Sequence, residues 1–172
     1  MQYKDLLRGA VLMTAAGATA LAAVSAVAIN SEGDDTLATL AFGWWIVSIG
    51  VGIWLGRPAR AVEALRGPLA AARTVTSLPA ESAGRIAFSR LWPIAVFVVA
   101  AGALGPFVPQ VPAIATGFAL GVAAAWRSRE PAVTAIEDRD GVTFYVENGS
   151  AFEPIKLIRT PGLRTGRNLE GV

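Results

Sequence analysis

The sequence predicts an all-α membrane protein with four transmembrane helices, an amphipathic cytoplasmic loop and a small C-terminal antiparallel β-hairpin or meander. Two observations lead to this fold class. Hydrophobic residues make up 53% of the 172-residue chain, above the roughly 45–50% of a typical soluble domain, and most of them fall in four runs before residue 127. In addition, all fifteen Lys and Arg residues lie outside these runs, on one side of the membrane that the runs define.

The four apolar runs have lengths that suit a bilayer. The first two cover residues 9–29 and 37–56 and contain no charge. As a helix, the first reaches about 31 Å at about 1.5 Å per residue, enough for a hydrocarbon core of about 30 Å. The third and fourth cover residues 91–107 and 111–126 and lie near the lower limit of about 17 residues. Four full spans are therefore expected, with a re-entrant hairpin of the last two as the alternative.

The N-terminus allows a second interpretation of the first run. Residues 1–8 are charged, and the small residues that end at Ala28 resemble a signal-peptide cleavage site. However, the apolar run is longer than the roughly 7–15 residues of a signal-peptide core. We therefore predict a permanent first helix, with a cleaved signal as the alternative.

The basic residues predict the orientation in the membrane. They fall in residues 1–8, in the loop 57–90 and after residue 126, whereas the acidic loop 30–36 and the turn 108–110 contain none. The positive-inside rule makes the three basic segments cytoplasmic, so both termini are expected in the cytoplasm. The abundant Ala, Gly and Arg are typical of a GC-rich bacterial genome, which indicates the bacterial cytoplasmic (inner) membrane.

Tryptophans and glycines fit the predicted spans. Three tryptophans fall at cytoplasmic helix ends and are expected to lie at the membrane interface: Trp54, Trp92 and Trp126. Trp44 and Trp45 fall deeper, where they are expected to contact lipid or the helix at 9–29, with the wall of an apolar ligand site as the alternative. Small residues four positions apart predict close helix packing at Gly52, Gly56, Gly117 and Gly121.

The loop 57–90 contains a weakly amphipathic helical pattern, either one helix or two short ones separated at Gly67–Pro68. Its apolar face is formed by Ala59, Val62, Leu65, Leu69 and Ala72. Four arginines are candidates for contact with anionic lipid headgroups: Arg57, Arg60, Arg66 and Arg73. A solvated connector is the alternative interpretation of this loop.

The cytoplasmic tail, residues 127–160, changes to the period of two that is typical of β-strands. The predicted strands cover residues 132–137, 142–147 and 154–159, whereas residues 161–172 are expected to be loose. So short a meander is marginal alone, so it should pack on the loop, on a second copy or on a partner protein. The candidate partner contacts are Val142, Phe144, Tyr145 and Val146.

The residue types that the chain lacks limit the chemistry that it can perform. With no Cys and no His it has no disulfide, thiol nucleophile, imidazole catalyst or common zinc site. No charged residue lies within a predicted span, which argues against ion-coupled transport. We therefore expect a non-enzymatic assembly or accessory subunit without cofactor, metal or nucleic acid, which contacts membrane lipids and binds a protein partner or its own copies. The alternative is an oligomeric pore or permease subunit for passive transport, although helix 9–29 offers only Thr14, Thr19 and Ser25 as a polar stripe.

Overall fold

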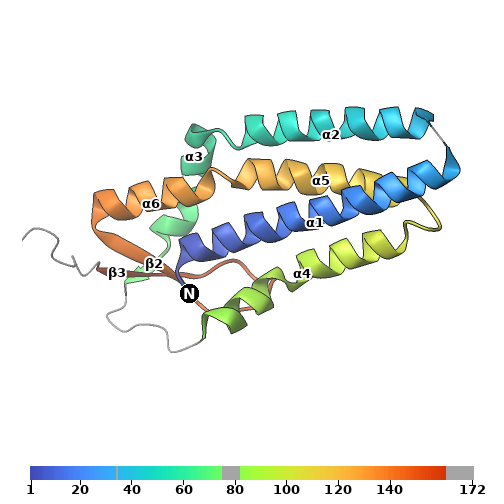
Figure 1. The fold of residues 1–172 in the computed structure, drawn as a ribbon. Coiled ribbons are helices and arrows are strands. Elements are labelled where there is room, and N and C mark those ends of the chain that lie inside the picture. The colour runs from blue at the N-terminus through green and yellow to red at the C-terminus, as the bar shows by residue number, and fades with distance from the viewer. Residues whose placement is uncertain (34, 75–81, 162–172) are drawn as a thin grey trace, which may run out of the picture.

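The computed structural model describes residues 1–33, 35–74 and 82–161, which form a mostly helical chain with a small mixed sheet (Figure 1). The helices are α1 (Tyr3–Glu32), α2 (Asp35–Leu55), α3 (Pro58–Ala70), α4 (Ala83–Ala103), α5 (Gln110–Trp126) and α6 (Arg129–Asp140). The strands are β1 (Arg73–Thr74), β2 (Val142–Val146) and β3 (Leu157–Pro161). Three helices, α1, α2 and α4, are long and apolar enough to cross a membrane, so the chain is a multi-pass membrane protein.

The four long helices lie side by side in the order α2, α5, α1, α4 (Figure 1). α5 is the shortest of the four. It lies between α2 and α1 and therefore packs against protein on both sides. The start of α1, the start of α4 and the ends of α2 and α5 all lie at the end of the molecule that carries the sheet (Figure 1). The turns between α1 and α2 and between α4 and α5 lie at the opposite end.

The observed helices extend beyond the apolar runs at their basic ends. α1 begins at Tyr3, and α4 begins at Ala83, eight residues before the predicted start at residue 91. The extra turns carry Lys4 and Arg8 in α1 and Arg85 and Arg90 in α4. A hydropathy pattern locates only the part of a helix that lies in hydrocarbon, so these polar first turns could not be detected from it.

The loop and the tail form one folded unit at this end, which we call the head: α3, α6, the three strands and the first turns of α1 and α4. One apolar core runs through it, formed by Tyr3, Leu6, Leu7, Leu65, Leu69, Ile86, Val133, Phe144, Val146 and Leu157. The tail therefore packs on the loop and on the membrane helices of its own chain, which was one of the three surfaces expected for it.

The strand predicted at residues 132–137 is wrong, because these residues lie in α6. Val133 and Glu137 are both buried, and their spacing of four places them on one face of the helix. Pro131 lies in its first turn, and Gly141 follows its last residue in a left-handed conformation with φ of 62°. The six-residue alternation was too short to distinguish a strand from a helix, and these two boundary residues outweigh it.

The sheet combines the predicted tail strands with a strand from the loop. β2 lies where a strand was predicted, and β3 begins three residues later than predicted, at Leu157. The two pair in antiparallel fashion, with Phe144 opposite Arg159. β1 was not predicted; it pairs with β3 in parallel, giving the order β1-β3-β2, so the sheet is mixed and not a meander of the tail alone. The C-terminus was expected to be loose from residue 161, but Pro161 is the last residue of β3; residues 162–172 lie outside the described residues.

The amphipathic pattern of the loop is one helix, α3, which continues through Gly67–Pro68. Pro68 falls in the last turn of α3. Its ring and its missing N–H therefore disturb only the end of the helix. The buried face contains Leu65 and Leu69 as predicted, together with Ala61, whereas Ala59 is exposed. This face packs into the core of the head, so α3 does not use it to enter the lipid interface.

Candidate functional site

Small residues bring α2 and α5 into close contact. A Cβ atom at Gly52 would collide with the carbonyl oxygen of Gly121, and a Cβ atom at Gly56 would lie 2.8 Å from backbone oxygens of α5. Gly117 lies against the indole ring of Trp44 in the same way. The four glycines singled out in the sequence thus all lie between these two helices, where the lack of a side chain lets the backbones approach.

Two tryptophan side chains fasten α2 to α5 within the apolar region. Nε1 of Trp44 donates a hydrogen bond to the carbonyl oxygen of Ile114 at 3.1 Å, and Nε1 of Trp45 donates to that of Ala113 at 2.8 Å. A carbonyl oxygen within a helix has a second lone pair, so it can accept such a bond in addition to its helical one. The two bonds satisfy both indole N–H groups without water, as the membrane interior requires.

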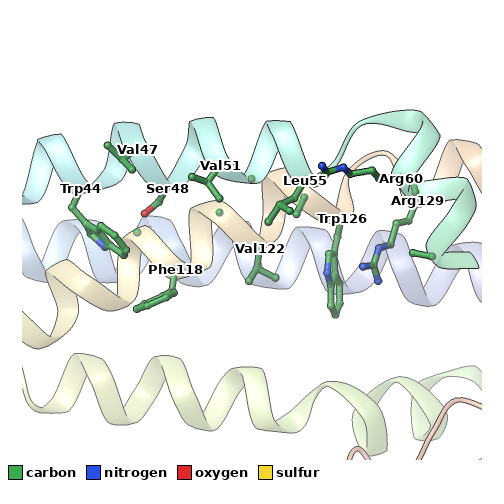
Figure 2. A pocket seen from close by; sticks show the side chains of 16 residues that line it. Trp44, Val47, Ser48, Val51, Leu55, Arg60, Phe118, Val122, Trp126 and Arg129 are labelled. Atoms are coloured by element: carbon green, nitrogen blue, oxygen red, sulfur yellow. The ribbon is translucent and has the colours of Figure 1, made fainter.

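A groove of about 540 Å³ lies between α2 and α5 and ends against α3 (Figure 2). We call it the α2–α5 groove. Most of its surface is apolar, and its walls include Trp44, Val47, Val51, Leu55, Phe118 and Val122. Trp44 thus lines an apolar groove; that this groove binds a ligand, the alternative that the sequence left open for Trp44, stays a prediction.

Two arginines occupy the head end of the groove (Figure 2). The guanidinium carbon of Arg60 lies 3.9 Å from the ring centre of Trp54, and that of Arg129 lies 4.9 Å from the ring centre of Trp126. Both distances are within the range of cation–π attraction, which holds each guanidinium beside an aromatic ring. Within residues 1–33, 35–74 and 82–161, neither arginine has a carboxylate within ion-pair distance. The groove therefore combines an apolar body with a positively charged end.

Of the four arginines predicted to contact lipid headgroups, only Arg60 lines the groove. Arg57, Arg66 and Arg73 are exposed elsewhere on the head. The structure brings Arg60 together with Arg129, which sequence analysis did not single out. One signal pointed to Arg129: it follows Trp126 by three residues, and in the structure the short turn between α5 and α6 keeps the two side chains together.

Two of the three predicted interface tryptophans, Trp54 and Trp126, lie at the head end of their helices, whereas Trp92 lies in the middle of α4, nine residues after its start at Ala83. Trp54 and Trp126 contact the two arginines of the groove, whereas Trp92 contacts the loop between β2 and β3, where the ring of Phe152 lies 6.0 Å away, edge to face. Arg90 holds this loop by donating hydrogen bonds to the carbonyl oxygens of Ser150 and Glu153, at 2.6 and 2.8 Å. Phe152 is 80% exposed, so the loop presents an aromatic side chain beside an interface tryptophan.

Hydroxyl groups within the long helices are mostly used by their own helix. Thr14, Ser25 and Thr116 are buried, and each donates to the carbonyl oxygen four residues earlier. Thr19 is exposed and makes the same kind of bond. Ser48 differs: its hydroxyl oxygen is buried in the wall of the α2–α5 groove and has no hydrogen-bond partner in the part of the chain that the structure describes.

A buried carboxylate joins three elements of the head. Glu137 on α6 is only 6% exposed. Its Oε1 accepts the backbone N–H of Phe144 in β2 at 2.9 Å, and its Oε2 lies 3.4 Å from Nζ of Lys4 in α1. The backbone N–H of Val146, on the same edge of β2, donates to the carbonyl oxygen of Met1 at 3.0 Å. The outer edge of β2 is thus closed by the carboxylate and by the N-terminal residues.

The four candidate partner contacts are covered to different degrees. Phe144 and Val146 are 3% and 0% exposed and belong to the core of the head, while Val142 and Tyr145 are half-buried. They were singled out because the strand seemed too short to find neighbours that would cover its apolar side chains. In the structure α1, α3 and α6 of the same chain cover the apolar face of β2, so they supply the neighbours that the tail alone lacks.

Comparison of the chain with models of protein families, with curated proteins and with solved structures found no match. Inference about function therefore rests on the residues and their geometry.

Proposed function

We propose that the protein is a non-enzymatic assembly or accessory subunit of the bacterial cytoplasmic membrane, which uses its head to bind a protein partner or a second copy of itself. The observation that supports this role is that the head is a single folded unit. Its parts come from segments separated in sequence by two membrane helices, yet they share one core, one sheet and one buried ion pair. A connector and a solvated tail would need none of these, whereas a binding module needs a fixed surface.

The membrane topology that we propose has four spans and both termini in the cytoplasm. The described Lys and Arg residues all belong to the head end of the molecule, where basic side chains outnumber acidic ones, and Asp35 lies at the opposite end. The positive-inside rule then favours a cytoplasmic head. α5 has 17 residues, about 25 Å of helix, which is near the lower limit for a span. Its place between α1 and α2 favours a full span over a re-entrant hairpin.

The binding surface that we propose is the β1 side of the sheet. Among the described residues no strand pairs with the outer edge of β1, whereas that of β2 is closed. Three exposed arginines, Arg66, Arg73 and Arg159, come from α3, from the edge strand β1 and from the middle strand β3, which pairs with β1. An acidic, extended partner segment fits such a surface, because it can pair with the strand edge and with the charges.

The test compares two variants that lose the same number of charges. Replacing Arg66, Arg73 and Arg159 with Gln is expected to remove the bound partner or the second copy from protein purified in mild detergent, as measured by native mass spectrometry. The control replaces Arg57, Arg85 and Arg127, which are exposed beside the membrane helices, and should keep the parental mass and partners. If the first variant also keeps them, this surface does not mediate assembly.

Passive transport, the alternative role, has less support. A pore needs polar groups that face the path of water or ions, and the residues that could form a stripe on α1 were Thr14, Thr19 and Ser25. Each of their hydroxyl groups donates to a carbonyl oxygen of α1 itself. Their hydrogen-bonding capacity as donors is therefore already used within the helix.

A further inference from the structure

We infer that the α2–α5 groove binds an anionic phospholipid of the cytoplasmic leaflet, with an acyl chain along the groove and the headgroup phosphate at Arg60 and Arg129. This lipid site is separate from the partner surface proposed at β1, because the two use different arginines. It would persist if the assembly role were wrong.

The length of the groove matches one leaflet. Along α2 its wall extends from Trp44 to Leu55, which is about 16 Å at about 1.5 Å per residue. Half of a hydrocarbon core of about 30 Å is about 15 Å. A lipid whose headgroup lies at the head end would therefore reach the inner end of the groove near the middle of the bilayer. The volume of about 540 Å³ lies within the roughly 300–1,000 Å³ that is usual for small-molecule sites.

The charge at the head end selects the headgroup. A guanidinium group can donate two parallel hydrogen bonds to a phosphate, and neither Arg60 nor Arg129 is paired with a carboxylate in the described part of the chain. Trp54 and Trp126 hold the two guanidinium groups at the level where headgroups lie. Arg60 also lies in the first turn of α3, which has no acidic residue, so the helix dipole adds to the positive potential.

A second apolar cavity would hold the other acyl chain of the same lipid. Phe118, Val122 and Trp126 line up along α5 and form one wall of the α2–α5 groove (Figure 2). The same three side chains also line a neighbouring cavity of about 450 Å³ that is bordered by Pro93 and Phe97 of α4. The two chains of one lipid would thus lie on either side of this ridge, below a shared headgroup.

A helix from a second copy fits the groove less well than a lipid. Helices approach closely in membranes where small residues are exposed, but here Gly52 and Gly117 are buried between α2 and α5. The groove wall contains these glycines together with larger side chains such as Val51 and Phe118, which interrupt the small-residue surface. An acyl chain is narrow and flexible enough to follow such a surface, whereas a helix about 10 Å wide is not.

The test of headgroup selection uses full-length protein in vesicles of equal parts phosphatidylglycerol and phosphatidylcholine, with retained lipids identified by native mass spectrometry. The parent should retain phosphatidylglycerol preferentially. A charge near an anionic surface changes affinity by about fivefold, so Arg60→Gln with Arg129→Gln should weaken this retention by about 30-fold. The control, Arg57→Gln with Arg127→Gln, removes two exposed arginines near the ends of α2 and α5 that do not line the groove, and it should weaken retention by much less. Equal losses in both variants, or no preference in the parent, would overturn the assignment.

A second test distinguishes a lipid in the groove from a free anion or a second copy of the chain. Val122→Trp should fill the groove and abolish retention of phosphatidylglycerol, whereas Val99→Trp, on an exposed position of α4, should not. Excess inorganic phosphate should fail to displace the retained lipid, because it lacks the acyl chain. Displacement by phosphate would show a site for a free anion, and a loss of dimer in Val122→Trp without a loss of lipid would show that a second copy occupies the groove. Either result refutes the inference.

Discussion

The buried carboxylate of Glu137 allows the stability of the head to be tested with one pair of residues. Lys4 lies 3.4 Å from Glu137, and it is one-third exposed, whereas the carboxylate is 6% exposed. Lys4→Met would leave a buried negative charge that keeps only the backbone N–H of Phe144 as a partner. Glu137→Gln removes the charge but keeps an oxygen for that N–H, and the remaining ammonium group can still reach water.

The two single substitutions should therefore differ in magnitude. Removing one partner of a buried pair usually costs about 3–5 kcal/mol. We expect Lys4→Met to cost about 3 kcal/mol, at the lower end of that range, because the site lies next to a partly exposed side chain. Glu137→Gln should cost about 1 kcal/mol, the value of an ordinary hydrogen bond. In the double variant no charge remains, so it should be more stable than Lys4→Met alone.

Hydrogen exchange of the amides in β2 measures this effect directly. The N–H groups of Phe144 and Val146 are bonded within the head, so they exchange when the head opens. A loss of about 3 kcal/mol corresponds to exchange about a hundredfold faster in Lys4→Met. Amides in the middle of α1 should be unaffected and serve as the internal control. If the double variant loses the sum of the two single losses, Lys4 and Glu137 act independently and the ion pair does not hold the head.

Three further predictions concern the membrane helices. Gly52→Ala should force α2 and α5 apart, because the new methyl group would collide with the backbone of α5. We expect it to lower the free energy of unfolding by about 1–3 kcal/mol in a detergent denaturation assay. Gly50→Ala is the matched control, because a methyl group there meets nothing within 4 Å. Trp45→Phe should cost about 0.6 kcal/mol in the same assay, the mean for a hydrogen bond between membrane helices. A cysteine at Ser31 should react with an impermeant maleimide in intact cells, whereas one at Ser150 should react only after lysis; the opposite pattern would reverse the topology.

The long helices could be predicted because their signal is local. Each apolar run is continuous in sequence, and its length is compared with the bilayer, which is the same for every protein. Even α5, the shortest, lies within one residue of the predicted range 111–126. The head lacked such a signal. β1 has two residues and becomes a strand only through β3, far along the chain. The segment at 132–137 has helix-boundary residues in Pro131 and Gly141, but the burial of Val133 and Glu137 on one helix face is known only from the fold.

The candidate site could be predicted only in part, for a related reason. The sequence singled out Arg60 as a basic residue near lipid, and Trp126 as an interface residue, because both lie next to an apolar run. Nothing in the sequence brings α3 and α6 to the same groove, so Arg129 was missed. Glu137 was missed because a carboxylate can be buried only when a partner exists, and its partners, Lys4 and an N–H of β2, are known only from the fold.

The groove and the head share two helices, which would link the proposed lipid binding to the proposed partner binding. On α6, Arg129 lines the groove, and Val133 and Glu137 follow on the same face, in the core and in the ion pair. On α3, Ala61 lines the groove and Leu65 lies one turn further, in the core. The two arginines come from segments far apart in sequence, so both line the groove only when the head is folded. A lipid bound there stabilises the folded head by mass action, and by reciprocity a partner that binds the folded head raises its affinity for the lipid.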